Sequence, residues 1–151
     1  MKFKKNVRKH IYCCGCREDV LARLTVGLEI YPHLPNLATL PFWKCDTCGN
    51  YVGCHYKTKD KTKPLGNIPT PEIRQARKII HQVIDPLWKN NLCKRDEIYN
   101  WLTERLGYEY HTAKIKSMPE ARIVVHQLNQ FKIHLKVRRE KQGFNNHKGV
   151  L

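Results

Sequence analysis

Two short stretches decide the fold of this chain: Tyr12-Cys-Cys-Gly-Cys16 and Lys44-Cys-Asp-Thr-Cys-Gly49. Each stretch contains one Cys-x-x-Cys pair, and 28 residues separate the two pairs. Two such pairs supply the four thiolates that a closed tetrahedral zinc site requires. The sequence therefore predicts one structural zinc ion, held by four cysteines: Cys13, Cys16, Cys45 and Cys48.

Each pair fits a zinc knuckle, a tight turn that directs two thiolates at one metal ion. Gly49 follows the second pair and supplies the permissive backbone that such a turn often needs, whereas Arg17 occupies this place after the first pair. A pairing of Cys14 with Cys16 in the first knuckle stays open. The alternative to a metal site is that these cysteines are buried as small hydrophobic residues. Two ligand spacings rarely arise together by accident, so the metal site is favoured.

Strand patterns surround the second knuckle. Residues 41–45 lead into it and residues 51–56 lead out of it, which gives a strand, a knuckle and a strand. Between the two cysteine pairs, apolar and polar residues alternate from Leu24 to Ile30, which is the period of a half-buried strand. We therefore expect a zinc ribbon, built on a small antiparallel sheet, over residues 12–63.

The number of cysteines and the N-terminal sequence indicate the cellular compartment. The total of seven is odd, and the basic N-terminus runs into cysteines without an apolar segment, so a secreted disulfide framework is not expected. No stretch is long and apolar enough for a membrane span, and a cytoplasmic location is expected. Cys54 is expected to pack as a hydrophobic residue, His55 to face solvent or support the zinc site, and Cys93 to be structural.

The second half of the chain predicts three helices. Pro71 suits the first position of a helix, and Pro86 predicts a kink or a restart within it. A second helix is expected over 94–106. A third follows Ser117, with an inner stripe of Ala121, Val124, Val125, Leu128, Phe131 and Leu135. The predicted fold class is α+β, with a three-helix segment over 64–136 packed on the ribbon.

Positive charge suggests the partner. The chain has 28 Lys and Arg against 13 Asp and Glu, a net charge of +15. The basic residues concentrate in an arm at 1–11, in the loop 57–63 and in a tail at 137–151 that is expected to be disordered. Such density favours binding to nucleic acid, DNA before RNA, although a basic surface kept for solubility is the alternative. The predicted phosphate contacts are Lys4, Lys5, Arg8, Lys9, Lys57, Lys59, Lys61, Lys63, Arg138 and Arg139.

A histidine and an aspartate raise a second functional hypothesis. His81 and Asp85 are i, i+4 neighbours on the first predicted helix, beside Trp88. A surface ion pair that supports the helix is the simpler interpretation. Alternatively, His55, His81 and Asp85 hold a hydrolytic metal that activates water, which would make the protein a metal-dependent nuclease. No nucleotide-binding or Ser-His-Asp motif is present, and a binding protein is expected rather than an enzyme.

The order of these motifs resembles the small "zinc-finger-containing domain" proteins of phages and bacteria, over roughly Tyr12 to Leu128. Its most specific elements are Val52-Gly-Cys-His55 and Asp85-Pro-Leu-Trp88. The resemblance implies a four-cysteine zinc site joined to a helical segment, and a phage or prophage setting, but no activity. A protein-interaction adaptor that docks on host proteins through the ribbon is a third hypothesis. Five further residues sit at family-motif positions: Cys54, His55, His81, Asp85 and His111.

Overall fold

The computed structural model describes the backbone of residues 6–148 and the side chains up to residue 143. The chain divides into two compact units. The ribbon unit comprises residues 1–75 and 113–117, and the helical unit comprises residues 76–112 and 118–151. The sequence predicted a boundary at residue 64, whereas the change of unit falls after residue 75, inside the first long helix.

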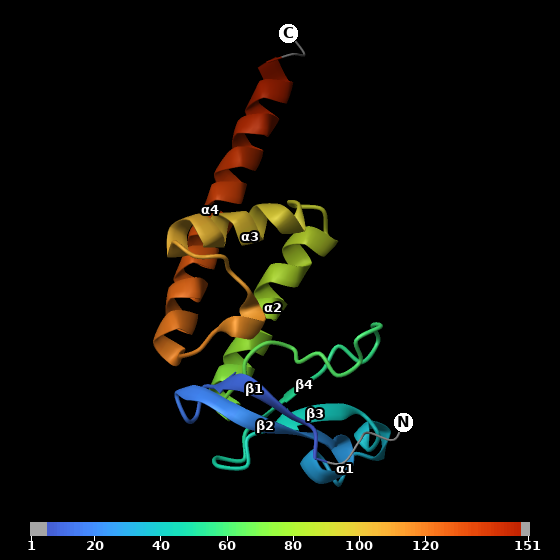
Figure 1. The fold of residues 1–151 in the computed structure, drawn as a ribbon. Coiled ribbons are helices and arrows are strands. Elements are labelled where there is room, and N and C mark those ends of the chain that lie inside the picture. The colour runs from blue at the N-terminus through green and yellow to red at the C-terminus, as the bar shows by residue number, and fades with distance from the viewer. Residues whose placement is uncertain (1–5, 149–151) are drawn as a thin grey trace. The chain divides into compact units, whose positions relative to one another are not determined.

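The ribbon unit is built on a four-stranded antiparallel sheet in the order β1-β2-β3-β4 (Figure 1). Strands β3 and β4 flank the second knuckle as predicted. With the helices that follow, this sheet confirms the predicted α+β class. The strands and short helices of this unit are β1 Arg8–Cys13, β2 Glu18–Val26, α1 Gly27–Ile30, η1 Pro35–Leu37, β3 Pro41–Lys44 and β4 Tyr51–Gly53.

Two predictions about the first half are wrong. The residues 8–11 of the predicted basic arm form most of β1, because they pair with β2, with Ile11 opposite Val20. The strand predicted over Leu24–Ile30 ends at Val26, and α1 follows. The chain turns at Gly27, whose amide donates a hydrogen bond to the Leu40 carbonyl at 2.9 Å. A Cβ atom here would lie 1.7 Å from the Leu37 carbonyl oxygen, so only glycine allows this approach.

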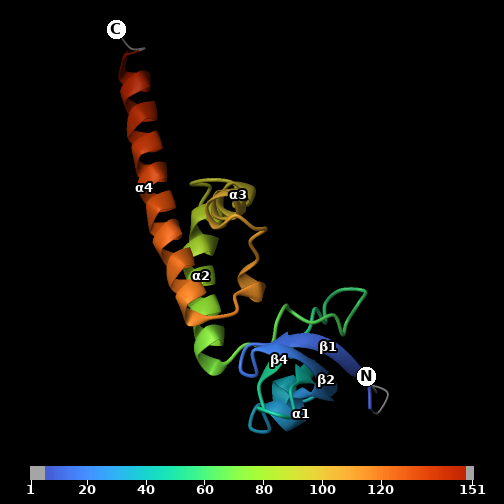
Figure 2. The same cartoon turned by 60° about the vertical axis from the view of Figure 1, so that its left-hand side comes forward.

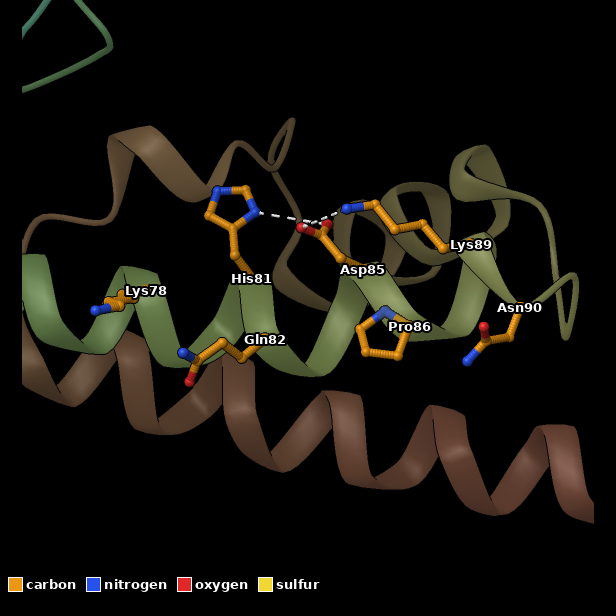
Figure 3. A pocket seen from close by; sticks show the side chains of 7 residues that line it. All are labelled: Lys78, His81, Gln82, Asp85, Pro86, Lys89 and Asn90. Carbon is orange, nitrogen blue, oxygen red and sulfur yellow. Dashed lines mark ion pairs between the residues drawn. The ribbon is translucent and has the colours of Figure 1, made fainter.

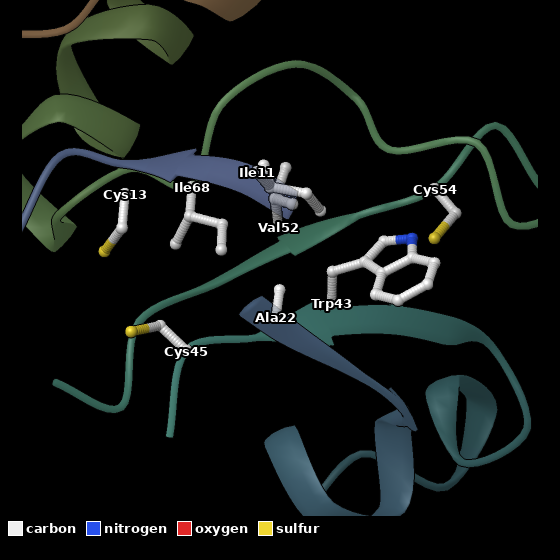
Figure 4. Packing of buried hydrophobic residues seen from close by; sticks show 8 residues of the cluster. All are labelled: Ile11, Cys13, Ala22, Trp43, Cys45, Val52, Cys54 and Ile68. Atoms are coloured by element: carbon white, nitrogen blue, oxygen red, sulfur yellow. The ribbon is translucent and has the colours of Figure 1, made fainter. Parts of the chain in front are cut away.

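The core of the ribbon unit lies against one face of the sheet. Trp43 and Val52 are cross-strand neighbours, and Trp43 packs beside Cys54 (Figure 4). Ile68 joins this core from the segment after β4, because its amide donates to the Tyr12 carbonyl at 2.9 Å. Residues 64–75 thus belong to the ribbon unit. The core residues are Ile11, Cys13, Ala22, Trp43, Cys45, Val52, Cys54 and Ile68.

Three long helices follow, as predicted: α2 Pro71–Lys89, α3 Arg95–Leu106 and α4 Met118–Lys148, with the short helix η2 Thr112–Lys114 before α4. Helix α2 continues through Pro86 without a restart. Gly107 ends α3 with a φ of 79°. Helices α3 and α4 pack together, and Trp101 on α3 donates its indole N–H to the Gln127 carbonyl at 3.2 Å. The predicted stripe of α4 is buried except for Val125, which lies about 100° around the helix from Val124.

The predicted disordered tail is wrong over residues 137–148, because α4 continues to Lys148 as one helix (Figure 2). Residues 136–142 contain no glycine or proline, and all of them except Val137 are good helix formers. Arg138 also ties this part of α4 to α3, with its guanidinium 2.9 Å from the Glu97 carboxylate. The last three residues, 149–151, lie outside the described part. None of the helices within 6–148 is long and apolar enough to cross a membrane.

Candidate functional site

The sheet topology brings the two knuckles together. The first knuckle connects β1 to β2, and the second lies between β3 and β4. Because all neighbouring strands are antiparallel, both turns lie at the same end of the sheet. The four predicted ligands converge there, with every Sγ atom within 4.8 Å of the others. The Sγ atoms of Cys13 and Cys48 are 3.4 Å apart, and those of Cys16 and Cys45 are 3.7 Å apart.

These distances fit a zinc ion. A tetrahedron with Zn–S bonds of about 2.3 Å has sulfur atoms about 3.8 Å apart, close to the two distances found. Among residues 6–143, the four cysteines form the one group of three or more metal-ligating side chains. The cluster can therefore hold one zinc ion, and the predicted cofactor is confirmed. Four thiolates leave no open position for substrate or water, which is typical of a structural site.

Both knuckles close with the same hydrogen bond. The Arg17 amide donates to the Cys13 carbonyl at 2.8 Å, and the Gly49 amide donates to the Cys45 carbonyl at 2.8 Å. Both donor residues adopt a positive φ, 59° at Arg17 and 80° at Gly49. The first knuckle therefore forms although it lacks the glycine that favours this backbone conformation.

The four thiols differ in burial and in acidity. Cys13 and Cys45 are buried, whereas Cys48 is exposed. Burial raises the pKa of Cys13, and a hydrogen bond with Cys45 is the main cause that raises the pKa of Cys16 to about 11. The pKa of Cys48 is lowered: burial alone would raise it, but hydrogen bonds from the Asn50 amide and the other thiols outweigh this effect. All four thiols lose their protons when they bind zinc, so zinc binding releases protons.

Two residues beside the second knuckle were missed by the sequence reasoning. The Asn50 side chain donates its Nδ2–H to the Cys48 Sγ atom at 3.2 Å. Asp46 accepts from Arg23 at 2.9 Å and from Arg8 at 3.1 Å, and Arg23 is the main cause that lowers the pKa of Asp46 to about 2. These ion pairs attach the second knuckle to β1 and β2. No sequence pattern indicated these ion pairs, because the pairing of β1 was not predicted.

The other cysteines stay outside the metal cluster. Cys14 is buried with its Sγ atom 3.9 Å from the Ile115 carbonyl oxygen, so the alternative pairing of Cys14 with Cys16 is not adopted. Cys54 lies in the core, where burial raises its pKa to about 12, and His55 is exposed. Cys93 is half-buried in the helical unit.

The pair predicted for the nuclease hypothesis forms on α2. Nδ1 of His81 lies 3.9 Å from the Asp85 carboxylate, which also accepts from the indole N–H of Trp88 at 3.3 Å. Figure 3 shows His81 and Asp85 in an open depression, with Lys89 beside the carboxylate. His55 belongs to the ribbon unit, and His111 pairs with Glu109 at 3.2 Å. Among the described side chains, no third metal ligand joins His81 and Asp85, and the nuclease hypothesis stays a prediction.

The basic residues fall into two classes. Several are neutralised: Arg8 by Asp46, Arg138 by Glu97, and Arg23 by both Asp46 and Glu29. The loop 57–63, called the basic loop below, is different, because its four lysines are exposed and form no ion pair with a described residue. Of the other predicted phosphate contacts, Lys4 and Lys5 lie outside the described residues.

The backbone of the basic loop is fixed to the sheet. The His55 amide donates to the Lys63 carbonyl at 2.8 Å, and the indole N–H of Trp43 donates to the Thr62 carbonyl at 2.6 Å. Within the loop, the Thr58 hydroxyl donates to the His55 carbonyl at 2.7 Å. The sheet therefore presents the four lysines from a defined backbone rather than from a loose segment.

Comparison with known proteins supports the zinc site. Searches of curated proteins and of solved structures found no match to the chain. A family model described as a zinc-finger-containing domain matches residues 8–132, which include both knuckles, the basic loop, α2, α3 and much of α4. With its four cysteines converging at one end of the sheet, the chain belongs to this zinc-finger-containing domain family.

Proposed function

We propose that this protein binds nucleic acid through the phosphate backbone, with the basic loop as its main contact. One observation carries the proposal: four lysines, without acidic partners among the described residues, stand on a loop whose backbone is hydrogen-bonded to the sheet. Zinc contributes indirectly, because it holds the sheet that carries the loop. A phage or prophage setting in the host cytoplasm is part of the proposal and is supported by the motif order alone.

The lysines suit phosphate better than a protein partner. Four like charges within seven residues repel one another, and Asp60 is the one acid among them. Phosphates of a nucleic acid would relieve this repulsion and release condensed counterions. Lysine contacts of this kind position a protein but carry no sequence code. Binding is therefore expected without strong sequence preference, with duplex DNA as the first ligand to test.

The structure offers a matched pair of variants. The loop variant replaces Lys57, Lys59, Lys61 and Lys63 by Gln. The control variant replaces four exposed or solvent-facing cations of α4, Arg122, Lys132, Lys136 and Arg139, by Gln, so that both variants lose the same charge. These four form no ion pair with a described residue either.

The experiment is a titration of zinc-loaded protein with labelled duplex DNA, single-stranded DNA and RNA over a salt series. Four phosphate contacts on duplex DNA contribute a slope of about −3.6 in a plot of log K against log salt. The loop variant should lose most of that slope, and the control variant should keep it. The control also tests Arg139, a predicted phosphate contact. An equal loss in both variants would show that net charge, rather than the basic loop, carries the binding.

A further inference from the structure

Helix α4 carries a second apolar stripe, on the side opposite its buried face. The inward face packs Val124, Leu128, Phe131 and Leu135 into the helical unit. The outward stripe contains three large apolar side chains that stay in solvent: Ile123, 52% exposed, Ile133, 57% exposed, and Val137, 43% exposed. Scattered exposed apolar residues are normal in proteins. These three residues form a binding surface only if their spacing places them along one line of the helix.

The spacing is that of a heptad repeat. Positions 123, 126, 130, 133 and 137 alternate steps of three and four residues, and His126 and Gln130 fill the two positions between the apolar ones. Such a seam is what a helix presents to another helix in a coiled coil. From position 123 to position 137 it runs about 21 Å along the helix. The seam is therefore suited to a helix of about two heptads.

Positive charge is concentrated on one side of this stripe. At about 100° per residue, a row of four cations lies on one side together with a single acid, Glu140, whereas Gln127, His134 and one cation, Lys141, lie on the other side. The row consists of Arg122, Lys132, Lys136 and Arg139, the residues of the control variant above. None of them forms an ion pair with a described residue. A partner that fits this face is apolar along its centre and acidic along one edge.

A second copy of the same helix does not meet this requirement. In a helix pair, the residues beside the seam form the interhelical salt bridges. On α4 none of these flanking residues is acidic, so pairing with a second copy gives no salt bridge between them and brings lysines together. They are Arg122, Gln127, Asn129, His134, Lys136, Lys141 and Gly143.

We propose that the outward face of α4 docks an acidic amphipathic helix of another protein. The apolar residues of that helix would cover Ile123, Ile133 and Val137, and its carboxylates would pair with the cation row. The proposal is separate from nucleic-acid binding, because it uses α4 and not the basic loop. It gives the adaptor hypothesis a different surface from the ribbon that the sequence suggested.

The test uses a labelled peptide of about 21 residues, in which two central heptads carry Leu at the seam positions and Glu along one edge, with helix-forming residues at both ends. A scrambled peptide of the same composition is the control ligand. Two variants of the full zinc-loaded chain separate the contributions: Ile133→Gln with Val137→Gln removes apolar surface, and Lys132→Gln with Lys136→Gln removes charge. Leu21→Gln with Ile79→Gln removes exposed apolar surface elsewhere and is the control protein, since these side chains are 54% and 45% exposed.

The heptad peptide should bind the unaltered protein, and each α4 variant should weaken this binding at least tenfold, while the control protein keeps it. Circular dichroism should show unchanged folding, because all substituted side chains are exposed. Equal binding of the scrambled peptide, or full binding by Ile133→Gln with Val137→Gln, would overturn the proposal. So would a dimer in sedimentation equilibrium that the same double variant abolishes, because a second copy would then be the occupant. Failure of the loop variant to lose DNA affinity bears only on the proposed function.

Discussion

The two zinc knuckles have the same spacing and the same closing hydrogen bond, yet they are built differently. Both knuckles begin with a core cysteine, Cys13 or Cys45, but the first contains a second buried residue, Cys14, and closes with Arg17 at a positive φ. The second knuckle ends with the exposed Cys48, closes with Gly49, and is held from outside by Asp46 and Asn50. The first is fixed by packing, whereas the second is fixed by its backbone and by polar neighbours.

This difference shows that the two halves of one metal site can be held in position by different parts of the structure. The first knuckle keeps Arg17 in a backbone conformation that arginine alone disfavours, next to the buried Cys13 and Cys14. In the second knuckle, glycine removes that strain, and hydrogen bonds replace burial. The comparison predicts that equivalent substitutions in the two knuckles have unequal effects.

The largest effect is expected from the cysteines. Cys13→Ser removes a buried ligand from the centre of the ribbon core, so we expect loss of zinc and unfolding of the ribbon unit. A structural zinc ion contributes about 10 kcal/mol or more to folding, which exceeds what a small core supplies alone. Cys48→Ser removes an exposed ligand, and three thiolates remain, so weaker zinc binding with a folded sheet is expected. Zinc release to a chromogenic chelator and far-ultraviolet circular dichroism measure both.

Cys93→Ser is the control, since Cys93 lies in the helical unit and outside the cluster. It should keep one zinc ion per chain. If Cys13→Ser also keeps one zinc ion with unchanged affinity, the ligand set is wrong. If Cys13→Ser and Cys48→Ser behave alike, the burial of a ligand does not decide the effect of losing it.

The spacing of the four cysteines predicted the metal site well, because two Cys-x-x-Cys pairs already indicate zinc ligands in the sequence. The β-strand that carries Cys13 was not predicted, since Arg8, Lys9 and His10 hide the alternation that Ile11 continues. The residues that support the second knuckle could not be predicted without that strand, because Asp46 contacts Arg8 only when β1 pairs with β2. Local patterns identify ligands, whereas the residues that position them depend on contacts distant in the sequence.

A smaller effect is expected at Asn50, whose side chain supports the exposed thiolate of Cys48. Asn50→Ala removes the hydrogen bond to the Cys48 Sγ atom, and loss of such a supporting contact typically lowers metal affinity by about tenfold or more. Competition with a zinc chelator of known affinity measures the change. Asn36→Ala is the control, because Asn36 is exposed in η1 and away from both knuckles. Equal zinc affinity in the two variants would mean that the second knuckle does not need its polar neighbour.

Gly49→Ala should act on the backbone alone. A Cβ atom at Gly49 meets no heavy atom within 4 Å, so the cost is the positive φ of 80°, about 1 kcal/mol in the free energy of unfolding. Urea denaturation of the zinc-loaded protein measures it. Gly143→Ala offers a control of opposite sign, because Gly143 lies inside α4, where alanine is the better helix former. A cost at Gly49 well above 1 kcal/mol would reveal a contact that the open space around it does not suggest.

The smallest effect, and the sharpest test of the comparison, is expected at Arg17. Its φ of 59° is strained for arginine by about 1 kcal/mol, and Arg17→Gly would remove this strain. Glycine also makes the unfolded chain more flexible, which returns part of the gain, so the expected stabilisation is about 0.5 kcal/mol. Arg17→Asn, which tolerates this φ without that added flexibility, should stabilise by a similar amount. The same urea denaturation applies, and a loss of stability in both variants would mean that the arginine side chain itself holds the first knuckle.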